Sequence, residues 1–139
     1  MILRYDPVDL KNRRKTQLKN EEGNVLYWGI YDFAFKYRTR IYDSSDTEQG
    51  YVQLDLSRSV PEVVFYDNED KPVGSMTVKD GSYLITPEGL LFTGDCAKGE
   101  ITNVMKIVDG AIEIENGADP FRCVMVLFAS VEIARGEEA

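Results

Sequence analysis

The segment that decides the fold of this chain reads Asp119-Pro120-Phe121-Arg122-Cys123-Val124-Met125-Val126-Leu127-Phe128-Ala129-Ser130-Val131-Glu132-Ile133-Ala134-Arg135. It is apolar on nearly all sides, and a helix of that kind must be buried or lie in a membrane. Asp119 suits a helix N-cap and Pro120 suits the first helical position. A helix of about fifteen residues would be roughly 22 Å long, which fits the bore of a small barrel better than a bilayer. The alternative is a long buried strand, because valine and isoleucine are common in this run.

The residues before this run are predicted to form short strands joined by tight turns. β-branched and aromatic residues occur in short groups separated by Gly, Asn and Asp. Asp80-Gly81 is typical of a two-residue hairpin turn, since both residues adopt positive φ at little cost. Further turns are predicted at Pro87-Glu88-Gly89 and Asp109-Gly110. The predicted strands cover residues 16–19, 25–30, 38–43, 51–56, 63–66, 73–78, 82–86, 90–93, 100–108 and 111–115.

A degenerate repeat runs through these hairpins. Residues 18–27 resemble residues 65–74, and residues 41–52 are a looser third copy. Repeated hairpins favour a closed meander, because closure removes the exposed edges of a sheet. We therefore expect one domain over residues 1–139, a mainly β, closed antiparallel barrel with strands over about 14–115 and a central helix over about 120–135.

This arrangement predicts where a binding site lies. A barrel filled by its own helix has no room inside for a ligand, so we expect any site on the outer surface or at the rim. The helix residues expected to serve only as structural core are Phe121, Cys123, Val124, Met125, Leu127, Phe128 and Val131.

The composition excludes several kinds of site. The 139 residues include 24 acids, 16 bases and no histidine, which gives a net charge of −8. A Ser-His-Asp or Cys-His nucleophile system is therefore excluded within this chain. The negative charge repels nucleic acid, which is not expected as a partner. We predict no catalytic residue, metal ligand or cofactor, and the two cysteines do not make a disulfide scaffold.

The beginning of the chain carries no targeting signal. Residues 1–6 lack the basic start, apolar middle and small-residue cleavage site of a signal peptide. No apolar run reaches the ~18–20 residues needed to span a bilayer. We expect a cytoplasmic protein, with peripheral contact to a membrane left open and the oligomeric state undetermined.

The order of elements resembles a known family. Serial hairpins with turns rich in Asp, Asn and Gly, closed by an apolar C-terminal helix that opens at Asp119, look like the tubby-like superfamily. Within it the chain is most similar to the LURF-one-related (YxjI-like) branch, with phospholipid scramblases as distant relatives. The resemblance covers the chain from about Arg14 onward. It implies a barrel of about twelve strands around a central helix, and it does not imply an enzyme. The family's lipid-binding residues cannot be matched here residue by residue.

One basic cluster is a candidate contact for an anion or a lipid headgroup. It consists of Lys11, Arg13, Arg14 and Lys15, with Lys19 nearby. Each such side chain contributes on the order of 1 kcal/mol at an anionic membrane surface. The alternative is a solvated N-terminal segment. Lys36, Arg38 and Arg40 share one face of a predicted strand and either extend this cluster or pair with neighbouring acids.

Three other segments carry weaker signals. The acidic turns at residues 43–48 and 67–70 lack the ligand spacing of an EF-hand, so we interpret them as solvated turns. Residues 94–99 lack the Gly-Lys-Ser/Thr ending of a phosphate-binding loop and are predicted to be a plain loop. Tyr27, Trp28, Tyr31, Phe33, Phe35 and Tyr37 form either an exposed binding platform or core packing, and the alternation of Phe33, Phe35 and Tyr37 predicts one buried face.

Two functional hypotheses follow. The first is a non-enzymatic binding or scaffold module whose surface or rim holds a protein partner or a lipid headgroup. The second is a small-ligand-binding β-barrel, or a cryptic enzyme, with its site in the strand-end loops.

Overall fold

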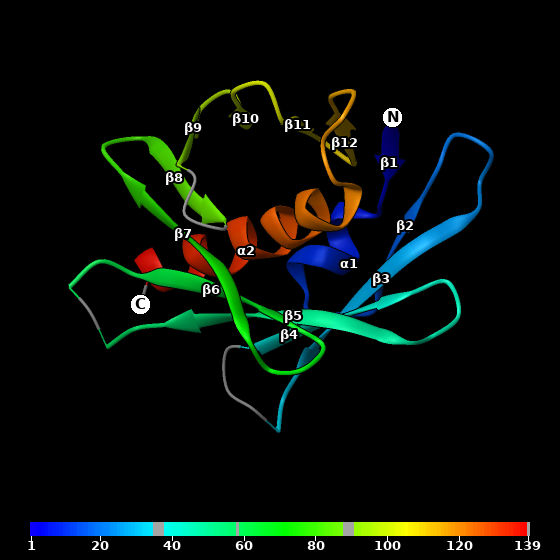
Figure 1. Ribbon diagram of the computed structural model, residues 1–139, viewed down its shortest axis with the longest axis horizontal. Coiled ribbons are helices and arrows are strands. Elements are labelled where there is room, and N and C mark those ends of the chain that lie inside the picture. Colours follow the sequence, from blue (N-terminus) through cyan, green and yellow to red (C-terminus); the bar gives the residue numbers. More distant parts are fainter. Residues whose placement is uncertain (35–37, 58, 88–90, 139) are drawn as a thin grey trace.

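The computed structural model describes residues 1–34, 38–57, 59–87 and 91–138. Twelve strands and two helices follow one another along the chain (Figure 1). They are β1 (Ile2–Arg4), α1 (Pro7–Lys11), β2 (Thr16–Lys19), β3 (Val25–Asp32), β4 (Arg38–Asp43), β5 (Glu48–Asp55), β6 (Glu62–Asp67), β7 (Pro72–Lys79), β8 (Ser82–Pro87), β9 (Phe92–Asp95), β10 (Glu100–Ile101), β11 (Met105–Val108), β12 (Ala111–Ile114) and α2 (Pro120–Glu138). Pro87, Glu137 and Glu138 are described by their backbone alone.

The strands form a closed antiparallel barrel in which each strand pairs with its neighbours in sequence. The ring closes where β1 pairs with β12, with Ile2 opposite Glu113. The amino group of Met1 continues this seam by donating to the carbonyl of Ile114 at 3.1 Å. The closed barrel was predicted, but β1 was not, because the strands were expected to begin near residue 14.

Helix α2 lies within the ring of strands (Figure 1). Asp119 caps it by accepting from the backbone N–H of Phe121 at 3.0 Å. Seven successive residues from Cys123 to Ala129 are buried, so the helix is enclosed on every side over almost two turns. It contacts α1 as well as β3, β5, β6, β7 and β12. The prediction of a helix rather than a strand is confirmed, and the helix extends three residues beyond Arg135.

The barrel wall buries the alternate residues of its strands, as β periodicity requires. Leu18 of β2, Ile41 of β4 and Phe65 of β6 point inward and are almost fully buried. One close approach sets the position of the helix. A Cβ at Gly29 would stand 2.3 Å from Cζ of Phe128, so the helix packs against β3 only because that position lacks a side chain.

The internal repeat is visible as three equivalent turns. The side-chain Oδ1 of Asn20 accepts from the backbone N–H groups two and four residues later, and Asp43 and Asp67 do the same in their turns. The third residue after each of them has positive φ, and these residues are Gly23, Asp46 and Asp70. Each turn is preceded by a register shift in its hairpin. The acidic residues of the two later turns are thus explained by turn geometry.

Two local predictions need correction. Residues 100–108 do not form one strand, because a turn with Asn103 at φ 61° separates β10 from β11. Phe33 does not belong to a buried face, since it lies in the turn after β3 and is 78% exposed. The predictions for Phe35, Lys36, Tyr37 and the Glu88-Gly89 part of a turn lie outside the described residues.

Candidate functional site

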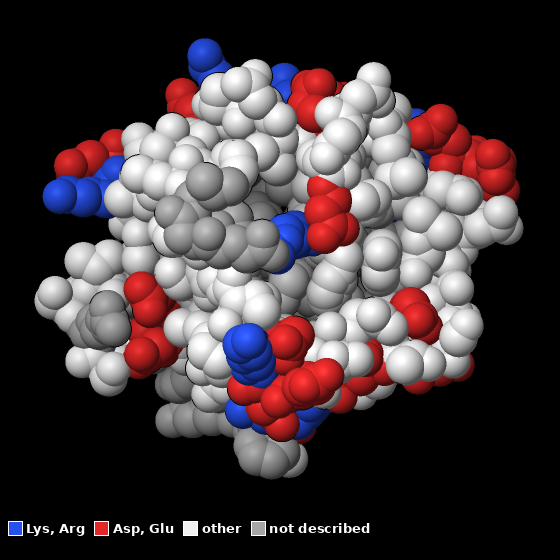
Figure 2. Space-filling model, in the orientation of Figure 1, with Lys and Arg blue, Asp and Glu red and all other residues white. Residues whose placement is uncertain are grey.

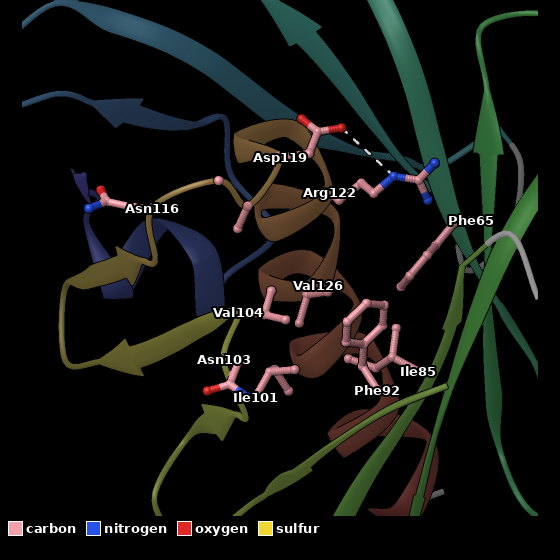
Figure 3. A pocket seen from close by; sticks show the side chains of 12 residues that line it. Phe65, Ile85, Phe92, Ile101, Asn103, Val104, Asn116, Asp119, Arg122 and Val126 are labelled. Carbon is pink, nitrogen blue, oxygen red and sulfur yellow. Dashed lines mark ion pairs between the residues drawn. The ribbon is translucent and has the colours of Figure 1, made fainter. Parts of the chain in front are cut away.

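A cavity of about 370 Å³ lies inside the barrel, between α2 and strands β6 and β8–β10 (Figure 3). Its apolar lining comes from several elements: Phe65, Ile85, Phe92, Ile101, Val104 and Val126. Phe65, Ile85, Phe92 and Ile101 occupy inward positions of their strands, Val104 comes from the turn between β10 and β11, and Val126 lies on the facing side of α2. The volume falls within the roughly 300–1,000 Å³ of typical small-molecule sites. The cavity opens at the end of the barrel where α2 begins, which agrees with the expected rim site, and its apolar part reaches between α2 and the wall, where the helix was expected to leave no room.

The mouth of the cavity is polar. Asn103 comes from the turn between β10 and β11, and Asn116 comes from the loop between β12 and α2. The cap of α2, Asp119, and Arg122 in its first turn form an ion pair with 3.7 Å between Oδ2 and Nε (Figure 3). An apolar interior thus opens through a mouth that carries one charge of each sign, and the side-chain amide of Asn116 points away from the cavity (Figure 3).

The two charged side chains at the mouth of the cavity also contribute to the structure around α2. Asp119 caps α2, and its carboxylate is 57% exposed. Arg122 lines the cavity with its Nη1 fully buried, while 31% of its side chain is exposed. This arrangement fits recognition of a ligand's polar end better than acid–base chemistry, because the carboxylate is held as a helix cap.

Of the seven residues of α2 predicted as structural core, five are buried and two are half-buried. Cys123, Val124, Met125, Leu127 and Phe128 are buried, and Phe121 and Val131 are half-buried. Burial, with a smaller contribution from the negative charge of Asp119, raises the pKa of the Cys123 thiol to about 12. The thiol therefore stays protonated near neutral pH and behaves as a small core residue.

The predicted basic cluster is divided by the structure. Arg13 turns inward, pairs with the buried carboxylate of Glu132 at 3.2 Å, and lies 4.0 Å from the centroid of the Tyr31 ring. Glu132 also accepts from Arg135 at 2.8 Å, and Arg135 donates in turn to the carbonyl of Lys11. Arg13 therefore ties the chain after α1 to the end of α2 and is not a surface contact. Lys11 and Arg14 remain exposed.

Lys15 and Lys19 lie instead in a groove on the outer surface, which we call the basic groove. Arg4 of β1 completes its basic lining, and Tyr5 and Gln17 contribute neutral side chains. Asp6 and Asp9 bring two carboxylates to the same space, whose volume is about 470 Å³. Arg4 was not predicted, because it lies far from the cluster in sequence and arrives only through the pairing of β1 with β2.

Arg38 and Arg40 belong to a different surface. Arg40 pairs with Asp32 at 2.7 Å and Glu48 at 2.6 Å, and Arg38 stacks on the Tyr51 ring at 4.1 Å. Burial alone would lower the pKa of Arg40, but the hydrogen bonds to both acids outweigh it and raise that pKa. Of the two options left open, pairing with neighbouring acids is the one observed for Arg40. Figure 2 likewise shows charged side chains of both signs mixed along the periphery of one face.

Comparison with known proteins adds no assignment. No family model, curated protein or solved structure matches this chain. The resemblance to the tubby-like superfamily therefore stays a prediction. Within the described residues, no group of histidine, cysteine and acidic side chains is arranged to hold a metal ion. None of the helices in this part of the chain is both long and apolar enough to cross a membrane.

Proposed function

We propose that this protein binds a small amphipathic molecule inside its barrel. The observation that carries this proposal is the cavity between α2 and β8–β10, whose walls are apolar and whose mouth is polar. A ligand would bury its apolar part among Ile85, Ile101 and Val126 and leave its polar end beside Asp119 and Arg122. The proposal adopts the second of the two functional hypotheses, although the C-terminal run is a helix and not a strand.

The size of the cavity limits the ligand. At the roughly 30 Å³ that a water molecule occupies in the liquid, 370 Å³ corresponds to on the order of a dozen non-hydrogen atoms. This is the size of a two-ring aromatic compound or a medium-length alkyl chain. Burial of that apolar surface would supply the affinity, and the mouth would set the orientation.

We propose a binding role and not catalysis. The lining of the cavity supports a binding role, because apolar side chains surround the space and the carboxylate of Asp119 accepts a hydrogen bond as the cap of α2. A protein partner or a membrane at the outer surface, the first functional hypothesis, stays a prediction.

The experiment uses 1-naphthol as a neutral two-ring probe and 1-naphthoate as its anionic counterpart. Each is titrated into the full chain while the methyl signals of Ile85, Ile101 and Val126 are followed by NMR. Saturable shifts confined to these methyl groups are expected. The ratio of the two affinities measures how far Arg122 favours an anionic end over a neutral one.

The matched variants are Val126→Phe and Val8→Phe. The first places a ring in the cavity and should reduce naphthol affinity at least about tenfold, the equivalent of ~1.4 kcal/mol, while keeping a cooperative melt. The second makes the same change at an exposed position of α1 and should bind like the wild type. If folded Val126→Phe binds as the wild type does, or the wild type shows no saturable shift, the proposed site is wrong.

A further inference from the structure

The basic groove carries an inference that does not depend on the cavity. Arg4 and Lys19 are direct partners across β1 and β2, and both side chains are exposed on the outer face. Like charges in directly opposite positions destabilise an antiparallel pair. Lys15 and Lys19 lie on this same face, because Thr16 and Leu18 between them are buried. Three positive charges therefore point toward one concave surface.

These charges are not balanced by the acids nearby. Within the described residues, Arg4, Lys15 and Lys19 make no ion pair at 4.0 Å or less, whereas Arg13, Arg40, Arg122 and Arg135 all do. Of the two carboxylates in the groove, Asp6 is occupied as the cap of α1, where it accepts from the backbone N–H groups of Val8 and Asp9. Because these hydrogen bonds leave the charge of Asp6 in place, three bases face two carboxylates in the groove, and the bases remain in excess.

One of the three bases is held in place. The ammonium of Lys15 lies 4.2 Å from the centroid of the Trp28 ring. Trp28 is itself fixed, because it stacks on Tyr42 at 4.2 Å and donates from Nε1 to Asp46 at 2.8 Å. Lys15 therefore presents its charge from a defined position, which lowers the entropy lost when a ligand binds.

We propose that the basic groove binds a phosphate monoester. A phosphate group carries close to two negative charges and three acceptor oxygens near neutral pH. The guanidinium of Arg4 offers paired donors to such a group, and the two lysines supply point charges on either side. A dianion would relieve the repulsion between Arg4 and Lys19 more fully than a single carboxylate. The net charge of −8 disfavours approach to an anionic bilayer, so the ligand is a soluble monoester.

The test titrates the full chain with sn-glycerol 3-phosphate by calorimetry, with acetate as the monovalent comparison. Saturable binding of the phosphate, weakened by added salt, is expected. A parallel flotation assay uses phosphatidylcholine vesicles with and without phosphatidic acid, which carries the same monoester on a lipid. Flotation with phosphatidic acid in the absence of binding to glycerol phosphate would overturn the soluble-ligand proposal.

Four variants make the assignment specific. Arg4→Gln and Lys19→Gln should each weaken glycerol phosphate binding about tenfold or more, the loss expected for one charge-assisted contact. Asp9→Asn should strengthen it, because one of the two carboxylates that repel the phosphate disappears. Lys79→Gln, an exposed lysine on β7, is the control for net charge. An equal loss in Arg4→Gln and Lys79→Gln, or no binding by the wild type, would refute the site. Since all four positions lie at the surface or partly exposed, a melt matching the wild type verifies folding.

Discussion

Replacing Arg13 with glutamine is expected to lower the free energy of unfolding by about 2–3 kcal/mol. The guanidinium lies 3.2 Å from Glu132 and 4.0 Å from the centroid of the Tyr31 ring. A hydrogen bond to a charged group contributes about 1.5–3 kcal/mol, and a cation–π contact contributes about 0.5–2 kcal/mol. Because 28% of the Arg13 side chain is exposed, we take the lower part of the summed range.

The assay is urea denaturation, with thermal melting as a second measurement. For a chain of 139 residues, each kcal/mol corresponds to roughly 3–5 °C, so the melting temperature should fall by about 6–15 °C. Arg14→Gln is the matched control, because it removes the same charge from an exposed neighbour. That variant should stay within about 0.5 kcal/mol of the wild type.

A double-mutant cycle identifies the partner. Arg13→Gln and Glu132→Gln are each compared with the combined variant, and a coupling of at least about 1 kcal/mol is expected for two residues in direct contact. Equal losses in Arg13→Gln and Arg14→Gln, or a coupling near zero, would refute the assignment of Arg13 to the interior. The basic cluster would then be a surface feature, as the sequence predicts.

Three further changes test the core and the turns. The wild type should lose stability as pH rises from about 9 toward about 12, because the Cys123 thiol ionises in the unfolded chain at lower pH than in the folded one. Urea denaturation at about pH 8 and about pH 10 measures this loss, and Cys123→Val should lack the part that comes from the thiol. Gly29→Ala should lower the free energy of unfolding by about 1–3 kcal/mol, because its Cβ clashes with the Phe128 ring, and adding Phe128→Leu should restore part of that loss. An unchanged midpoint of urea denaturation in Gly29→Ala would contradict this packing. Asp67→Ala removes the acceptor of two turn hydrogen bonds and should lower the free energy of unfolding by about 1 kcal/mol, measured by thermal melting. An unchanged melting temperature would show that these hydrogen bonds do not stabilise the turn.

The sequence was sufficient for the main architecture because its signals are local. Hairpin turns such as Asp80-Gly81 require positive φ, and both residues have it, at 53° and 77°. The helix was predictable because its cap, its length and its all-round apolar character lie within one run of residues. The repeat was predictable for the same reason, since an Asn or Asp at the start of each turn fixes its hydrogen bonds.

The candidate sites were harder to predict from the sequence, because they depend on contacts between residues far apart in the chain. β1 is three residues long and owes its place to partners on β12 and β2, so its pattern alone could not identify it. Arg4 could not be joined to Lys19 without that strand. The cavity exists because α2 packs less closely against one part of the barrel wall than against the rest. The amino-acid sequence alone does not show how closely two elements pack.

The seam between β1 and β12 has a consequence for the making of this protein. The amino group of Met1 donates a hydrogen bond to the carbonyl of Ile114, which lies 113 positions later in the chain. At roughly 5–20 residues per second of synthesis, about 6–23 s separate the appearance of the two residues. During that time the growing chain presents apolar strands without the helix that will cover them. We therefore expect the nascent protein to depend on chaperone protection, and its yield to be more sensitive to translation speed than its final stability would indicate.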